Sequence, residues 1–221
     1  MSKNTIFTDT VPFSNTFAPA IKAEIDKHLG PMGLHTIVVG SGLATGTSND
    51  LDLQVELEDV IEHFSSINAS MAREALARYL QLHGFETARK GINVFVKVPV
   101  GTSAYQVDLE VIYNADKVSK FHQHVIPEGS PYKGIHKQLF LVTLAKKNGF
   151  MYSAWEGLYN RTADNKKGEL VTNDWDQIAK ILLGPEHSGN DLACVESIMQ
   201  AMPPFHADLT LRAAETDQNW F

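Results

Sequence analysis

The sequence has few of the features that mark secreted, membrane or broadly nucleic-acid-binding proteins. Its 221 residues include one cysteine, Cys194, so no disulfide can form within the chain and a cytoplasmic location is expected. No stretch approaches the ~18–20 consecutive apolar residues of a membrane span, and residues 1–17 lack an uninterrupted apolar segment, so we expect neither membrane association nor a signal peptide. The net charge of -7 disfavours an extended, nonspecific nucleic-acid surface.

The composition is that of a folded protein, with 43% hydrophobic and 20% charged residues. We expect an N-terminal arm at residues 1–16, an α/β lobe at 17–115, a helical lobe at 130–205 and a tail at 206–221. Hydrophobic periodicity and capping residues predict helices at 17–29, 68–83, 135–147, 174–183 and 191–202, and strands at 34–39, 50–57, 92–98 and 104–113. The segments 161–173 and 184–190 are expected to be polar loops.

Two of the predicted strands carry acidic residues on one face. Apolar and polar residues alternate from residue 50 to 57, so Asp50 and Asp52 point the same way. Residues 105–111 alternate in the same manner and place Asp108 and Glu110 on a common face. If these strands are neighbours, at least three carboxylates meet on one side of the sheet.

Such a cluster is unfavourable without a cation. Two carboxylates ~4 Å apart repel by about 4 kcal/mol at an effective dielectric constant near 20, so the side chains either lie apart or bind a divalent metal. Oxygen-only ligands suit Mg²⁺ or Mn²⁺, and a pair of such ions can activate a hydroxyl and neutralise a leaving pyrophosphate. No cysteine and histidine set has the spacing of a zinc site.

A short turn precedes the first acidic strand. Gly40 and Ser41 follow the apolar strand at 34–39, where a tight turn can present backbone N–H groups to phosphate, and eight residues separate Ser41 from Asp50. Each motif alone is common. Taken separately, Asp50 is most simply a turn or cap residue and Asp52 a solvated strand residue.

In combination these residues resemble a known family. The run GSGLATGTSNDLDL is similar to the signature of the DNA polymerase β-like nucleotidyltransferase superfamily, which includes tRNA CCA-adding enzymes, poly(A) polymerases, oligoadenylate synthetases and aminoglycoside nucleotidyltransferases. The resemblance extends over residues 34–113. It implies an α+β fold, in which a nucleotidyltransferase-like mixed β-sheet with flanking helices is followed by a smaller helical lobe.

The resemblance also implies roles for individual residues. Gly40 and Ser41 would hold a triphosphate, while Asp50 and Asp52 would ligate Mg²⁺ or Mn²⁺. Asp108 would complete the metal site and help to deprotonate the acceptor. The sequence departs from the family pattern in two respects: the spacer after Ser41 is short, and no basic residue follows the turn, where Gly42, Leu43 and Ala44 stand.

The missing positive charge has candidates further along the chain. Residues 117–147 contain six lysines and one acid, Glu128; the lysines are Lys117, Lys120, Lys133, Lys137, Lys146 and Lys147. Lys133 and Lys137 are four residues apart and would project from one helix face if the helix begins that early. Similar superfamily members place a lysine of the helical lobe near the triphosphate, so we expect these two to bind phosphate; the alternative is a solvated helix face.

Three further features have competing interpretations. His122 and His124 could ligate a metal from one strand face, but a surface or packing role is favoured because no third ligand is placed. Tyr152, Trp155 and Tyr159 could stack a base, although aromatic residues at these spacings more often pack in a core. Glu110 could replace Asp108 if the strand sits two residues along; otherwise it is a solvated residue.

The leading hypothesis is a nucleotidyltransferase that moves a nucleoside monophosphate from an NTP, with ATP expected, to an acceptor hydroxyl and releases pyrophosphate. The acceptor could be an RNA 3′ end such as that of tRNA, a small molecule or a protein. The second hypothesis is an inactive nucleotide-binding or regulatory module on the same fold. The third is a structural protein in which the motif is coincidental.

Overall fold

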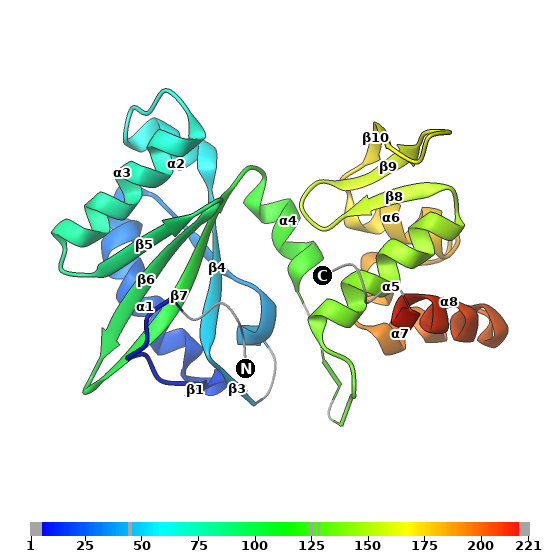
Figure 1. Cartoon of the computed structure of the whole chain (residues 1–221), viewed down its shortest axis with the longest axis horizontal. Coiled ribbons are helices and arrows are strands. Elements are labelled where there is room, and N and C mark those ends of the chain that lie inside the picture. The colour runs from blue at the N-terminus through cyan, green and yellow to red at the C-terminus, as the bar shows by residue number, and fades with distance from the viewer. Residues whose placement is uncertain (1–5, 44–45, 124–125, 128, 217–221) are drawn as a thin grey trace. The chain divides into compact units, whose positions relative to one another are not determined.

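The computed structural model describes residues 6–43, 46–123, 126–127 and 129–216, and the chain divides into two compact units (Figure 1). Unit 1 comprises Met1–Ser119 and unit 2 comprises Lys120–Phe221. Within the described ranges, no helix is long and apolar enough to cross a membrane.

Unit 1 is built on a five-stranded mixed sheet. Its spatial order is β2-β4-β7-β6-β5, and the strands are β2 Thr36–Val38, β4 Asp50–Glu56, β5 Glu86–Lys90, β6 Asn93–Val100 and β7 Ser103–Ile112. β4 and β7 run parallel, whereas the other neighbours are antiparallel. A parallel pair needs a long crossover connection, and here two helices and two strands lie between β4 and β7 in the chain.

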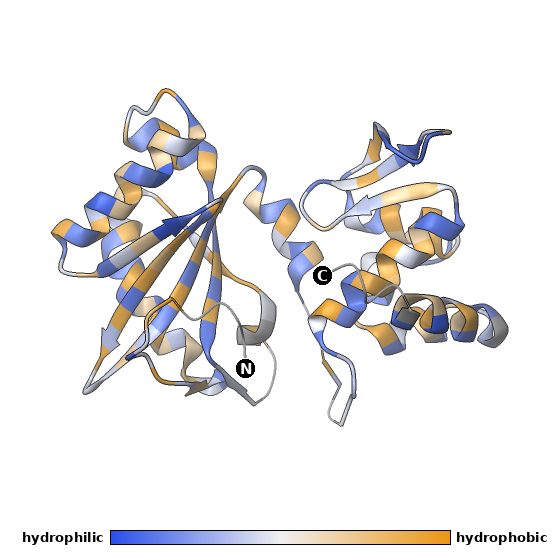
Figure 2. Ribbon diagram, in the orientation of Figure 1, coloured by the Kyte–Doolittle hydropathy of each residue, from blue (hydrophilic) through white to orange (hydrophobic). Residues whose placement is uncertain are grey.

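One face of this sheet forms the core of unit 1. The strands alternate hydrophobic and hydrophilic residues, which Figure 2 shows along β4, β6 and β7. Leu51, Leu53, Val107 and Leu109 are fully buried on the apolar face. Three helices contribute to the same core; they are α1 Ala18–Leu29, α2 Leu57–His63 and α3 Ala69–Leu82. The polar residues of the central strands are thereby directed to the opposite face.

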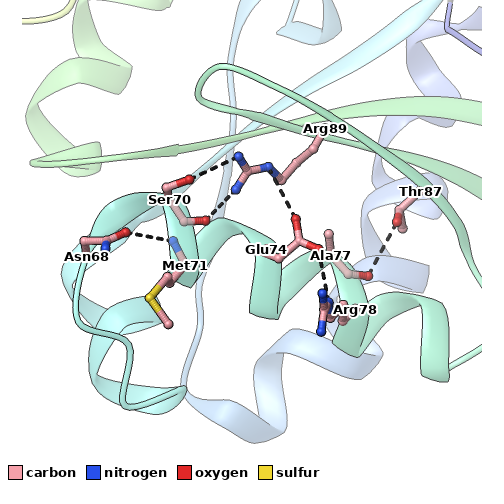
Figure 3. A network of polar contacts seen from close by, with 8 residues as sticks. All are labelled: Asn68, Ser70, Met71, Glu74, Ala77, Arg78, Thr87 and Arg89. Carbon is pink, nitrogen blue, oxygen red and sulfur yellow. Dashed lines mark hydrogen bonds and ion pairs between the residues drawn. The ribbon is translucent and has the colours of Figure 1, made fainter.

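The first turn of α3 is fixed by polar contacts (Figure 3). The Asn68 side chain accepts a hydrogen bond of 3.0 Å from the backbone N–H of Met71, which makes Asn68 the N-cap. Arg89 on β5 donates to the Ser70 carbonyl and approaches the Glu74 carboxylate at 3.8 Å. The helix predicted at 68–83 is confirmed, and its cap is attached to the edge strand.

Smaller elements complete unit 1 and lead into unit 2. A two-stranded ribbon pairs β1 Phe13–Ser14 with β3 Thr47–Ser48. Short 3₁₀ segments occupy Asn15–Phe17, Gly30–Met32 and Gly40–Leu43. Helix α4 Ala115–His122 spans the division between the units.

Unit 2 combines helices with a three-stranded antiparallel sheet. The helices are α5 Gly134–Lys147, α6 Trp175–Leu182, α7 Val195–Gln200 and α8 Pro204–Thr216. The sheet has the order β10-β9-β8, with β8 Phe150–Ser153, β9 Gly157–Arg161 and β10 Lys167–Thr172. Its core includes Phe121, Phe140, Leu158 and Ile178, all essentially inaccessible to solvent.

The mixed sheet with flanking helices confirms the predicted fold class, while two local predictions in unit 2 are wrong. The segment 161–173 is not only a loop, because β10 pairs with β9 there. The predicted helix at 191–202 is interrupted: a 3₁₀ turn at Gly189–Leu192 is followed by α7, with Cys194 extended between them at φ -146° and ψ 171°. Cys194 Sγ accepts a hydrogen bond from Ser197 N–H, so it caps a new helix instead of continuing the old one.

The Asn68 cap gives a direct test of this local structure. Asn68→Ala leaves the Met71 N–H without its side-chain partner and should destabilise unit 1 by about 1 kcal/mol, whereas Asn68→Asp retains an acceptor and should cost little. Hydrogen exchange of the α3 amides measures both effects. Equal protection in the two variants would show that the cap contributes nothing.

Candidate active site

The carboxylates predicted to act together lie on neighbouring strands. The register of β4 and β7 places Asp52 beside Asp108 and Asp50 beside Gln106. Because β4 is parallel to β7 and both keep their apolar residues in the core, Asp50, Asp52 and Asp108 share the polar face of the sheet. The condition set by the sequence, that the two acidic strands be neighbours, is met.

Burial and mutual repulsion dominate the electrostatics of this face. Burial raises the pKa of Asp52 well above its usual range, and the nearby charges of Glu110, Asp50 and Asp108 raise it further. Asp108 is 4% exposed, and burial raises its pKa to about 7, opposed by a hydrogen bond from Gln106. The pKa of Asp50 is also raised by burial. Negative charge on any one of these carboxylates therefore makes ionisation of its neighbours less favourable.

Three polar side chains of the same face were not included in the predicted site. The register places Gln54 beside Glu110, and Gln54 Nε2 donates to the Glu110 carboxylate at 2.8 Å. Burial raises the pKa of Glu110 to about 7, so this residue is not the solvated carboxylate expected from the sequence. Gln106 Nε2 donates to Asp108 Oδ1 at 2.7 Å. The period-two pattern that identified the aspartates already placed these residues on the same face.

The turn before β4 lies directly against Asp52. Val39 N–H donates to the Asp52 carbonyl at 3.0 Å, and Gly40 follows with φ +63°. A Cβ atom on Gly40 would lie 2.4 Å from Asp52 Oδ2, which is closer than any real contact. Position 40 therefore requires glycine for two reasons, its positive φ and its contact with a carboxylate of the candidate site. The side chain of Ser41 lies outside the described residues.

The donor set of this face suits a hard divalent cation. It offers carboxylate oxygens and one buried amide oxygen, Gln54 Oε1, which has no hydrogen-bond partner among the described residues. Such oxygen donors suit Mg²⁺ or Mn²⁺, and burial, with a smaller effect of neighbouring carboxylates, raises the pKa values of Asp52 and Asp108. In the part of the chain that the structure describes, no group of three or more acidic, histidine or cysteine side chains has converged to metal-binding geometry.

The two lysines predicted to bind phosphate differ in their surroundings. Lys133 is exposed at the N-cap of α5. Lys137 is 2% exposed, and its Nζ donates to the carbonyl oxygens of Phe121 at 3.0 Å and Gln123 at 2.7 Å. Burial lowers the pKa of Lys137 to about 7. They therefore do not form the jointly exposed pair that their spacing suggested, and the phosphate-binding role of each stays a prediction.

The histidine and aromatic candidates pack within unit 2. His122 ends helix α4 rather than lying on a strand, its Nε2 is 2.9 Å from the Ala154 carbonyl, and its ring is 4.3 Å from that of Trp155. His124 lies outside the described residues. Tyr152 is buried, whereas Trp155 is 40% exposed. Lys167 Nζ lies 4.0 Å from the ring centroid of Tyr159.

Replacement of Gly40 tests its contact with Asp52. Gly40→Ala should destabilise unit 1 by roughly 1–3 kcal/mol and displace the Asp52 carboxylate, because the new Cβ combines backbone strain with a clash. Gly101 has the same φ of +63° with nothing within 4 Å, so Gly101→Ala measures the backbone strain alone. Urea unfolding measures the stability loss of each variant, and hydrogen exchange of the β4 and β7 amides locates it. An equal loss in the two variants would contradict the close contact.

The buried His122 gives a pH test of unit 2. Burial lowers its pKa from 6.5 to about 4, so the unfolded chain binds this proton more readily than the folded one. Stability should therefore be complete above about pH 6.5 and fall by up to about 3 kcal/mol as the pH drops toward 4. His122→Gln should lose this component of the pH dependence. All three tryptophans, Trp155, Trp175 and Trp220, follow residue 119, so tryptophan fluorescence during denaturation reports on unit 2.

Comparison with known proteins gives no match to a family model or to a curated protein. Solved structures with some similarity include a cytoplasmic RNA terminal U-transferase, at 17% identity and a TM-score of 0.33 over 66% of this chain and 47% of that chain. A Cid1 structure described as an RNA terminal uridylyl transferase has 16% identity and a TM-score of 0.34, over 60% of this chain and 50% of that chain. Cid1 poly(U) polymerase with Mg and 3′-dATP bound has 15% identity and a TM-score of 0.36, over 78% of this chain and 67% of that chain.

The chain spans about half the length of the first two of these structures. With TM-scores below 0.5, the overlays add nothing to the description of the site. The strand order of unit 1 and the register of β4 with β7 are consistent with a nucleotidyltransferase-like fold.

Proposed function

We propose that the chain is a metal-dependent nucleotidyltransferase, which transfers a nucleoside monophosphate from an NTP to an acceptor hydroxyl and releases pyrophosphate. One observation supports this proposal above the others: Asp52 on β4 lies beside Asp108 on the parallel strand β7, on the face opposite the core. Neighbouring carboxylates on one sheet face repel one another, and a divalent cation would offset that repulsion.

Each residue of the site has a distinct part in the proposal. Asp50 and Asp52 hold Mg²⁺ or Mn²⁺, and Asp108 completes the set. When bound, the metal supplies charge neutralisation for the phosphates and the leaving pyrophosphate. Asp108, beside Asp52 on the same face, accepts the proton of the acceptor hydroxyl.

The turn and the lysines complete the proposed triphosphate site. Gly40 brings the backbone of the turn against Asp52, so phosphate oxygens can approach N–H groups and the metal at one place. Ser41 is proposed to bind phosphate with Gly40. Lys133 is exposed and able to meet phosphate charge, whereas Lys137 would first have to exchange its two carbonyl partners.

For the acceptor we propose an RNA 3′ end as the first candidate. The positive charge between residues 117 and 147 supports a short contact with a nucleic-acid terminus, and the net charge of -7 opposes an extended one. No base preference is proposed, so ATP and UTP are both tested as nucleotide donors. Small-molecule and protein hydroxyls are the other acceptor classes to be compared.

A second candidate is an inactive nucleotide-binding or regulatory module. It is favoured by the lack, among the described residues, of three side chains in metal-binding geometry, and by the eight-residue spacer between Ser41 and Asp50. This candidate predicts NTP binding without product. It also predicts that Asp108→Asn leaves cellular function intact.

The two candidates are separated by a transfer assay. Labelled ATP and UTP are incubated with Mn²⁺ or Mg²⁺ and with oligonucleotide, tRNA and small hydroxyl acceptors. Asp52→Asn and Asp108→Asn should each lower transfer at least about 100-fold, because they remove a metal ligand or a proton acceptor. Asp59→Asn, which alters an exposed carboxylate on α2, should leave transfer unchanged. A wild-type protein that binds NTP but transfers to none of these acceptors would favour the second candidate.

A further inference from the structure

The N-terminal segment of unit 1 reaches the candidate site. This segment, residues 6–15, is here called the arm. The Ile6 N–H donates to Gln106 Oε1 at 2.8 Å, and the Phe7 N–H approaches the same oxygen at 3.5 Å. Gln106 is fully buried on β7, two residues before Asp108. The arm therefore contacts a side chain on the same sheet face as the carboxylates.

The arm also determines which way the Gln106 amide points. A backbone N–H is only a donor, so Ile6 requires the carbonyl oxygen of the amide to face it. The NH₂ group then faces Asp108, where Gln106 Nε2 donates to Oδ1 at 2.7 Å. The reversed amide would set N–H against N–H at Ile6 and oxygen against a carboxylate at Asp108. The arm's backbone N–H groups, chiefly that of Ile6, thus favour the amide orientation that directs a donor at the carboxylate.

Asp108 needs such a donor to hold one orientation. The terminal torsion of an aspartate is broad, so packing alone leaves the carboxyl plane weakly defined. The bond to Oδ1 fixes that plane relative to β7. Asp52 is the registered neighbour of Asp108 across the strand pair, so the orientation of one carboxyl determines how the two can share a cation or substrate.

Contacts along the rest of the arm keep Ile6 in place. Phe7 is 6% exposed, and the Val11 N–H donates to the Ala104 carbonyl at 3.0 Å. Asp9 forms an ion pair with Lys97, a residue of β6 that pairs with Gln106 in the sheet register. These attachments occur on β6 and β7, so the arm and the candidate site are held by the same strands.

The C-terminal end of the arm contacts the segment that leads into Asp50. Phe13 and Ser14 pair with Ser48 and Thr47, and the Asn15 N–H donates to the Gly46 carbonyl at 2.9 Å. Gly46 to Ser48 belong to the spacer between the Ser41 turn and Asp50. The arm consequently holds the segment that carries Asp50 as well as the residue that orients Asp108.

We propose that Gln106 is a positioning residue and that the arm, through the Ile6 N–H, orients it so that the Asp108 carboxyl is presented to the cation and the acceptor. This inference rests on the proposed function for the part that concerns the cation. The arm would then act on the reaction without touching substrate, and residues 6–15 would be required for activity as well as for stability.

Two variants and a matched control isolate the effect. Gln106→Leu removes the amide, while Ile6→Pro removes the N–H that orients it and leaves Gln106 in place. Thr8→Pro is the control, because Thr8 is the second residue of the turn at Phe7–Thr10, where proline is favoured, and its N–H has no hydrogen-bond partner among the described residues. All three are made in the full chain, and their melting temperatures are recorded.

The first readout needs no metal. In the ¹⁵N-labelled protein, the side-chain amide resonance that Gln106→Leu abolishes belongs to Gln106. We expect its protons to exchange slowly in the wild type and in Thr8→Pro, and at least tenfold faster in Ile6→Pro. An unchanged exchange rate in Ile6→Pro overturns the inference, whatever the protein's activity.

The second readout is the affinity for Mn²⁺, measured by electron paramagnetic resonance. Loss of a residue that orients a metal ligand typically weakens binding by roughly 10–100-fold, so we expect this loss in Gln106→Leu and Ile6→Pro and none in Thr8→Pro. Wild-type affinity in both variants overturns the inference and leaves the proposed function standing. A wild type that binds no Mn²⁺ contradicts the proposed function instead, and the exchange rates alone then decide whether the arm orients Gln106.

Discussion

The parallel pairing of β4 with β7 is the constraint on which the rest of the structure depends. Its register sets the apolar residues of both strands against the helices and leaves the aspartates on the opposite face. Each buried aliphatic side chain contributes about 1.5–3 kcal/mol, so the six that face the core, Leu51, Leu53, Val55, Val107, Leu109 and Val111, together contribute on the order of 10 kcal/mol. That exceeds the repulsion of about 4 kcal/mol of one close carboxylate pair, which explains how the fold tolerates this site.

The same constraint explains the chemistry of the polar face. The strand ladder fixes the backbone positions of these carboxylates, so only side-chain rotation and local hydrogen bonds can relieve their repulsion. Gln54 donates to Glu110, and Gln106 donates to Asp108. These bonds oppose the effect of burial on the pKa of each acid without abolishing it, since both values remain near 7. A divalent cation would neutralise the carboxylate charge that the two amide hydrogen bonds offset only in part.

Unit 1 could be predicted further from the sequence than unit 2, and the reason is physical. Alternation over residues 50–57 and 105–111 predicts which residues of each strand share a face, whereas the strand pairing that brings Asp50 and Asp108 to one face comes from the fold. β10 is mostly exposed, carries Lys167 and Glu169, and pairs irregularly, so no such alternation marks it. The burial of Lys137 could not be foreseen, because its partners are backbone carbonyls at the end of α4 and a periodic pattern assigns lysine to solvent.

The proposed activity requires that the polar face of β4 and β7 bind a divalent cation together with a nucleoside triphosphate. The most direct measurement is a crystal structure with Mn²⁺ and a nonhydrolysable NTP, in which anomalous scattering locates the metal. We expect Mn²⁺ within bonding distance of Asp50 and Asp52, with the triphosphate at the Gly40 turn. Mn²⁺ and nucleotide bound elsewhere, or absent from this face at saturating concentrations, would contradict it.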